Sequence, residues 1–271
     1  MQSVYLGIDV GGTKTLVASL DHRGVITQEI RFPTPKVYED FVAELAVHLG
    51  ELETNDFKAG VIGVPGRVDR KRGVGLVFGN LPWKHVHICK DVEKLAKCPM
   101  SIENDAKLAG LSEAMLVKQY RRVLYVTIST GIGIGYIVDQ KIDPELADNE
   151  GGQMPLEHHG KFVEWEEFAS GRAFAKRFDR PVRQIKDERS LRVIAHDIAV
   201  GLVDLIAVLT PDIIVLGGSV GTYFDKYGDY LHEYLEKYDN PMITRPPIQI
   251  AGRPEQAVVY GCYDLARQIY G

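Results

Sequence analysis

The sequence has few of the features that mark secreted, membrane-embedded or disulfide-stabilised proteins. It has three cysteines in 271 residues, Cys89, Cys98 and Cys262, and no two of them form a C-x-x-C pair. This spacing suggests neither a disulfide framework nor a thiolate zinc site, and it favours reduced, buried or half-buried thiols. No apolar run approaches the roughly 20 residues that are needed to cross a bilayer.

Positive charge is not in excess, and the chain opens without a targeting pattern. The formal net charge of −5 gives no electrostatic reason to expect nucleic acid or an anionic membrane as a partner. The opening residues, MQSVYLGIDV, lack the basic and apolar regions of a signal peptide and run directly into an apolar strand pattern. We therefore expect a cytoplasmic protein that binds neither membranes nor nucleic acid.

Apolar patterning predicts a chain of mixed strands and helices. The expected strands are 5–10, 14–20, 25–32, 58–66, 100–105, two within 121–140, 212–219 and 247–252. The expected helices are 37–52, 91–99, 105–119, 164–178, 189–209, one before 247 and one from Pro254 to the end. The segment 67–87, rich in Gly and basic residues, reads as loop.

A supersecondary unit occurs twice. Residues 5–21 and 121–140 each contain an apolar strand, a Gly/Thr turn and a second apolar strand. Because 271 residues are long for one core, the repeat predicts two α/β lobes with a cleft between them.

The turn in the first copy, "DVGGTK", has the residues that a phosphate cradle needs. Gly11 and Gly12 let the backbone approach a ligand, Thr13 adds a hydroxyl donor and Lys14 adds positive charge. Asp9, at the strand end, could hold a hydrated Mg²⁺. The turn is neither the Rossmann fingerprint nor a Walker A loop, and a plain hairpin turn remains the alternative.

Further stretches carry a family resemblance. "GIDVGGTKT" resembles the first phosphate motif of the actin-like ATPase superfamily, in the form found in ROK-family sugar kinases. In chain order, "ENDAKLAGLSEA", "STGIGIG", "NEGGQM" with "EWEEFASG", and "PDIIVLGGSV" resemble the catalytic, second phosphate, sugar-binding and adenosine motifs, and "PGRVD" and "GNLPW" look like family loops. The resemblance implies a two-lobed actin-like, ribonuclease H-like α/β fold. Its lobes would be 1–104 with 255–271, and 105–254, with the terminal helix returning to the first lobe.

The same motifs imply the sugar side of a kinase site. Asp105 would act as general base on a sugar hydroxyl; its position between strand and helix also suits a helix cap. The residues that would bind the sugar are Asn104, Glu150, Gln153, Glu166 and Gly66. For Glu166 the alternative is a solvated helix face.

The donor side is implied in the same way, with ATP and Mg²⁺ as cofactors. Thr130, Gly131 and Gly133 would form a second phosphate cradle, or a simple tight turn. Gly217 and Gly218 would let adenine and ribose lie against the backbone, or serve only packing.

Two departures from the family leave substrate questions open. Most ROK proteins have Gly-His where this chain has Gly152-Gln153, and in them the histidine touches the sugar and often joins cysteines on zinc. Residues 154–168 contain no cysteine, so we expect no structural zinc site and interpret His158 and His159 as exposed loop histidines. The short cysteine-free segment resembles a compact branch that includes polyphosphate-using glucokinases and glucomannokinases.

The sequence therefore predicts a hexose kinase that phosphorylates the 6-hydroxyl of glucose or a relative. One alternative is polyphosphate as donor, guided by Arg67 and the run 68–73, which can also be a solvated loop. Another is a non-catalytic sugar-binding protein, which Gln153 favours. A repressor is not expected, since no helix-turn-helix fits before Tyr5. The sugar and the oligomeric state stay open, and because relatives are often dimers a homodimer is one alternative.

Overall fold

The computed structural model describes residues 3–238, 240–253 and 255–271. The chain folds into two compact units, 1–112 with 255–271, and 113–254. The expected boundary lay before Asp105, whereas the division in the structure falls within helix α3 (Asp105–Ala114).

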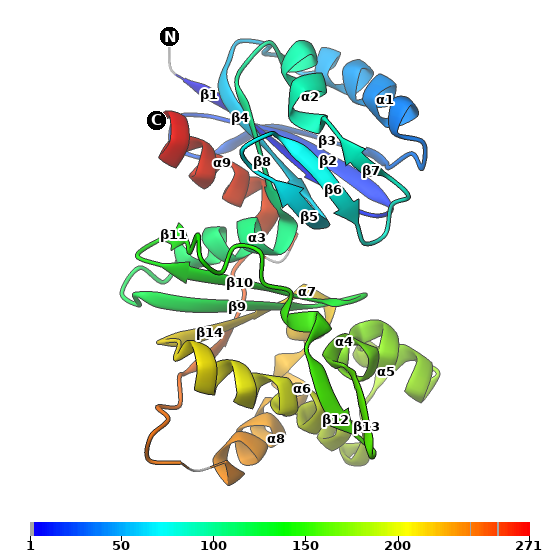
Figure 1. Cartoon of the computed structure of the whole chain (residues 1–271), viewed down its shortest axis with the longest axis vertical. Coiled ribbons are helices and arrows are strands. Elements are labelled where there is room, and N and C mark those ends of the chain that lie inside the picture. Colours follow the sequence, from blue (N-terminus) through cyan, green and yellow to red (C-terminus); the bar gives the residue numbers. More distant parts are fainter. Residues whose placement is uncertain (1–2, 239, 254) are drawn as a thin grey trace. The chain divides into compact units, whose positions relative to one another are not determined.

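A five-stranded sheet with the order β3-β2-β1-β4-β8 forms the centre of the first unit (Figure 1). Its strands are β1 (Val4–Val10), β2 (Lys14–Leu20), β3 (Ile26–Pro33), β4 (Phe57–Val64) and β8 (Met100–Asn104). β1 pairs antiparallel with β2 and parallel with β4, and β4 pairs parallel with β8. These are the strands that the apolar runs predicted.

Helices cover both faces of this sheet. They are α1 (Tyr38–Gly50), α2 (Ile88–Ala96) and α9 (Ala257–Tyr270), together with α3. Leu6 and Ile8 of β1 pack in one core with α1 and α2, while Tyr5 packs in another with α9. Since side chains alternate along a strand, these cores lie on opposite faces. Figure 1 shows α9, in red, beside the blue strands.

The expectation of a loop at 67–87 is wrong. This segment contains a three-stranded antiparallel sheet of β5 (Gly66–Asp69), β6 (Val74–Phe78) and β7 (Lys84–Val86). Val68, Val74 and Phe78 are buried. The strands are so short that their apolar residues give no readable alternation, and the basic residues lie mostly on exposed positions.

The second unit repeats the arrangement of the first. Its sheet has the order β11-β10-β9-β14-β15, with strands β9 (Arg122–Ile128), β10 (Ile132–Val138), β11 (Lys141–Ile142), β14 (Ile213–Gly217) and β15 (Ile248–Ile250). β9 pairs antiparallel with β10 and parallel with β14, as β1 does with β2 and β4. The internal repeat seen in the sequence is confirmed.

The remaining elements of this unit are mostly helical. They are η1 (Gly151–Gln153), η2 (Val182–Gln184), the hairpin β12 (Pro155–His158) and β13 (Lys161–Glu164), α4 (Trp165–Ala169), α5 (Gly171–Phe178), α6 (Glu188–Leu209), α7 (Gly218–Gly221) and α8 (Phe224–Lys237). The single helix expected at 164–178 is wrong. The helix breaks at Ser170, which has an extended backbone. The Ser170 side chain caps α5 by accepting a hydrogen bond from the Ala173 N–H.

The three thiols are free and buried, which confirms that expectation. Among the described residues, no helix combines the length and apolar character needed to cross a membrane.

Candidate functional site

The tip of the β1–β2 hairpin is a tight turn that a hydrogen bond from Lys36 stabilises. The Gly11 N–H donates to the Lys14 carbonyl over 3.0 Å, and the Lys36 ammonium donates to the Gly12 carbonyl over 2.6 Å. A Cβ on Gly12 would lie 2.6 Å from the Asn80 Cβ, so the turn has no space for a side chain there. Thr13 and Lys14 are exposed at the tip.

Asp9 and Asp105 interact electrostatically. Asp9 lies near the end of β1, and Asp105 begins α3 directly after β8. The pKa of Asp9 is raised from 3.8 to about 7. Burial is the largest cause and the negative charge of Asp105 adds to it, while the positive charges of Lys14 and Arg31 act in the opposite direction. A buried carboxyl with a second carboxylate acting on it fits a divalent cation, because the charge of the cation would stabilise the ionised form of Asp9.

The amide of Asn104 forms the N-cap of α3. Its Oδ1 accepts from the Ala106 N–H over 2.9 Å and from the Lys107 N–H over 3.2 Å, and its Nδ2 donates to the Gly66 carbonyl over 3.0 Å. The capping position, which the sequence left open for Asp105, is therefore taken by Asn104. Asp105 accepts from the Ala106 N–H over 2.8 Å.

An ion pair between buried Glu103 and half-buried Arg70 supports this segment, and sequence reasoning missed it. Both oxygens of Glu103 accept from Arg70 over 2.6 Å, and one also accepts from the Asn104 N–H over 2.7 Å. The Glu103 side chain is 5% exposed. Glu103 is the first residue of the "ENDA" stretch and lies in a predicted buried strand. A carboxylate at such a position indicates a charged partner, and this was the available signal.

In the second unit, Glu166 contacts the tip of the β9–β10 hairpin. Its Oε2 accepts from the Ile132 N–H over 3.1 Å, and a Cβ on Gly131 would collide with the same oxygen. The Glu166 side chain is 20% exposed. This carboxylate is therefore not on a solvated helix face. Gly133 lies in β10, opposite Thr127.

A pocket of about 360 Å³ joins this hairpin to two helix starts and the η2 region. It brings Thr130 together with Ser219 and Val220, which follow Gly217 and Gly218. Gly218 has φ 76°, and a Cβ there would lie 2.5 Å from the Ile128 carbonyl oxygen. The full lining is Ser129, Thr130, Gly171, Arg172, Pro181, Val182, Arg183, Ser219, Val220 and Tyr223. Sequence reasoning did not single out the two arginines.

The residues expected to bind a sugar from this unit lie around η1. Glu150 directly precedes it and Gln153 ends it, and both are exposed. Gly151 and Gly152 are buried against β10, where a Cβ on Gly152 would collide with the Ile132 carbonyl.

The expectation of two exposed loop histidines is wrong for His158. It ends β12, its side chain is 15% exposed, and it stacks on Phe168 with ring centroids 4.2 Å apart. Burial lowers the pKa of His158, with Asp197 acting in the opposite direction. His159 is exposed in the turn.

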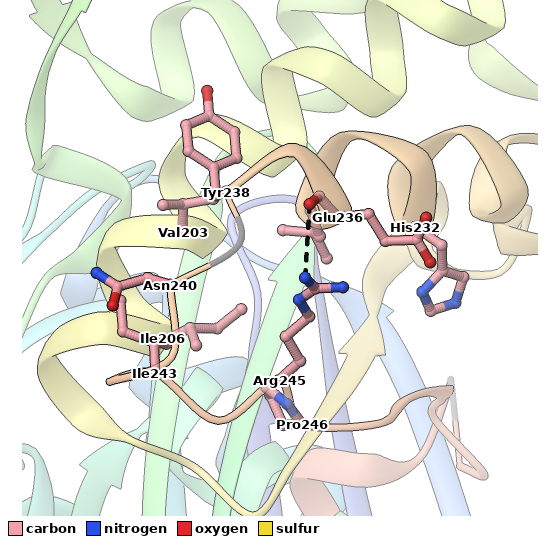
Figure 2. A pocket seen from close by; sticks show the side chains of 10 residues that line it. Val203, Ile206, His232, Glu236, Tyr238, Asn240, Ile243, Arg245 and Pro246 are labelled. Atoms are coloured by element: carbon pink, nitrogen blue, oxygen red, sulfur yellow. Dashed lines mark hydrogen bonds between the residues drawn. The ribbon is translucent and has the colours of Figure 1, made fainter.

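An apolar pocket of about 410 Å³ lies elsewhere in the unit, between α6, α8 and the segment 240–246 (Figure 2). In Figure 2 the Arg245 guanidinium points toward the carbonyl of Glu236. None of the predicted site residues lines this pocket.

The chain resembles solved structures of sugar kinases along nearly its whole length. A crystal structure of a ROK family glucokinase from Streptomyces griseus, in complex with glucose and AMPPNP, superposes with a TM-score of 0.81 at 25% identity, covering 99% of this chain and 100% of that one. The fold is thus that of the actin-like sugar kinases.

Residues 5–269 match the model of the ROK family, and the chain belongs to that family. The glucokinase of Streptomyces coelicolor is 25% identical, with 97% of each chain covered. The N-acetyl-D-glucosamine kinase of Haemophilus influenzae is 27% identical, covering 97% of this chain and 99% of the relative.

Proposed function

We propose that this protein is an ATP-dependent sugar kinase that transfers the γ-phosphoryl group to a hexose hydroxyl, with the 6-hydroxyl of glucose or a close relative as the first expectation. The observation that carries the proposal is the pair of interacting carboxylates, Asp9 and Asp105, at the ends of β1 and β8. The glucokinase and N-acetylglucosamine kinase relatives support the reaction class.

Asp105 is the general base in this proposal. It accepts the proton of the sugar hydroxyl as the oxygen attacks the γ-phosphorus. Asn104 fixes the first turn of α3 through its cap and its bond to Gly66, so the Asp105 backbone is held in place. Such positioning is a large part of catalysis in phosphoryl transfer.

Asp9 is the residue that would hold Mg²⁺, directly or through water. A bound Mg²⁺ would neutralise charge on the donor phosphates. The raised pKa of Asp9 fits this role, since a bound cation would add to the positive charge of Lys14 and Arg31 and stabilise the ionised carboxylate. Gly11, Gly12, Thr13 and Lys14 would contact phosphate oxygens at the neighbouring turn.

The second unit would bind the rest of the donor. Thr130, Gly131 and Gly133 would face phosphates, while the pocket after Gly217 and Gly218 would take the nucleoside. The association of Thr130 with Ser219 in one pocket supports this assignment.

Glu150 and Gln153 are proposed sugar contacts, because both are exposed beside η1. Gln153 donates and accepts hydrogen bonds but does not titrate, so the choice among hexoses is an experimental question. Polyphosphate as donor has less support: Arg70, within the suggested basic track, is neutralised by Glu103.

A coupled assay of ADP release over a panel of sugars tests the proposal, with glucose, mannose, fructose and N-acetylated amino sugars as acceptors. We expect sugar-dependent ADP release that requires Mg²⁺. A parallel arm replaces ATP by polyphosphate and measures sugar phosphate. Sugar binding without turnover on any acceptor would overturn the kinase assignment and favour a non-catalytic sugar-binding protein.

A further inference from the structure

The Glu166 carboxylate makes two contacts next to the turn of the β9–β10 hairpin. Oε2 accepts the Ile132 N–H, the first backbone donor of β10 after the turn. Oε1 lies 3.9 Å from the Arg172 guanidinium. One side chain thus hydrogen-bonds the hairpin tip and lies near a cation at the start of α5.

The second of these contacts borders the pocket of about 360 Å³ that contains Thr130. Arg172 lines this pocket together with Ser129 and Thr130. The start of α5 is also tied to the hairpin directly, because the Gly171 N–H donates to the Ser129 carbonyl over 2.7 Å. A Cβ on Gly171 would lie 2.7 Å from that carbonyl oxygen, so the close approach requires glycine.

We propose that Glu166 is a positioning residue for the phosphate donor. It anchors the β9–β10 hairpin through the Ile132 N–H, next to the pocket that contains Thr130 and Arg172. The inference rests on the proposed kinase function and adds a positioning role to the sugar-binding role that the family resemblance implies for this residue.

The charges in this cluster agree with a role in donor binding. A lone carboxylate beside a polyanion would repel it, and Arg172 offsets that charge. The hydrogen bond to Ile132 needs an acceptor but not a full negative charge, because the donor is a neutral backbone N–H. Glutamine can therefore replace Glu166 in the anchoring contact, and alanine cannot.

Titration calorimetry with AMPPNP in the absence of sugar isolates this role from any contact with sugar. We expect Glu166→Ala to weaken AMPPNP binding about tenfold, which corresponds to the loss of one hydrogen bond. Glu166→Gln should restore binding to within about twofold of the wild-type value, since it keeps the acceptor. Glu167→Ala, at the exposed neighbouring position on α4, is the matched control and should bind like wild type.

Hydrogen exchange supplies a second measurement that does not need the ligand. Exchange at 129–133 should be faster in Glu166→Ala than in wild type and should be restored in Glu166→Gln. If Glu166→Ala binds AMPPNP as wild type does, the donor role is refuted, even if the KM for sugar rises. If folded wild-type protein binds no AMPPNP, the kinase proposal itself fails, and this inference fails with it.

Discussion

At the scale of single residues, ionised Asp9 lowers the stability of the folded chain, and stability measurements can detect this effect. Burial and the charge of Asp105 raise its pKa from 3.8 to about 7, so the folded chain binds this proton more tightly than the unfolded chain. The protonated carboxyl stabilises the folded chain fully at pH values below the unfolded pKa of 3.8. This stabilisation is lost as the pH rises through about 7. A residue kept at such a cost agrees with a role in binding a cation.

Asp9→Asn should therefore stabilise the protein at neutral and alkaline pH. We expect its Tm to exceed that of wild type at pH 8 and the difference to shrink toward pH 4, because the amide does not ionise. Thermal unfolding across this pH range checks the prediction, with Asp56→Asn at an exposed position as control. A difference that is independent of pH would contradict the raised pKa.

At the scale of elements, the hairpin β12–β13 is attached to its unit through His158. Its ring stacks on Phe168, and its Nε2 lies 3.8 Å from Asp197, whose other oxygen accepts from Arg177 over 2.5 Å. The pKa of His158 lies below 6.5, mainly because the ring is buried. The charge of Asp197 acts in the opposite direction, and His159, Arg177 and His196 add to the lowering. The unfolded chain then binds the proton more readily, so stability falls as the pH drops below about 6.5.

His158→Phe should reduce this sensitivity to acid. The phenyl ring keeps the stacking on Phe168 and has no proton to bind. We expect the loss of Tm between pH 7.5 and pH 5.5 to be smaller than in wild type, whereas His159→Gln, in the exposed turn, should behave like wild type. If His158→Phe loses as much Tm between pH 7.5 and pH 5.5 as wild type does, protonation of His158 does not cause the sensitivity to acid.

Another element-scale prediction concerns the start of β5. Gly66 has φ 116°, and a Cβ there would collide with the Val77 carbonyl, while its own carbonyl holds the Asn104 amide. Gly66→Ala should cost about 1–3 kcal/mol of unfolding free energy from backbone strain and reduce kcat by displacing Asn104. Gly50→Ala, in open space at the end of α1, is the control and should be neutral or stabilising. Urea unfolding and steady-state kinetics measure both effects, and equal stability of the two variants would refute the strain argument.

At the scale of the whole molecule, the chain builds one unit from its two ends and the other from its middle. The core that α9 completes contains Val259, Cys262 and Ala266, packed with Tyr5 and Val61. The described core of the second unit contains no residue of 255–271. The two units therefore depend differently on the C-terminal segment.

Deleting 255–271 should unfold the first unit and leave the second folded. Removing α9 exposes one face of β1 and β4, while the core around Trp165 keeps its partners. Hydrogen exchange by mass spectrometry should show lost protection in β1, β2 and β4 and retained protection in β9, β10 and β14. Loss of protection in all six strands would contradict independent cores.

The limits of prediction from sequence follow from the range of the contacts. The repeated hairpins were predictable because apolar runs and glycine turns are local signals. The short strands at 67–87 and the hairpin β12–β13 gave no such signal, and the environment of His158 depends on Phe168 and Asp197 from other elements. At the site, the motifs pointed to Asp105 and Glu166. The Asn104 cap and the contacts of Glu166 with Ile132 and Arg172 required coordinates.

The most direct test of the kinase account is Asp105→Ala, with turnover and ligand binding measured on the same preparation. Loss of the general base should lower kcat about 10²- to 10⁴-fold, while sugar and AMPPNP bind with nearly unchanged affinity. Asp56→Asn should retain wild-type turnover. Wild-type turnover in Asp105→Ala would contradict the account, because the hydroxyl would then lose its proton to some other group.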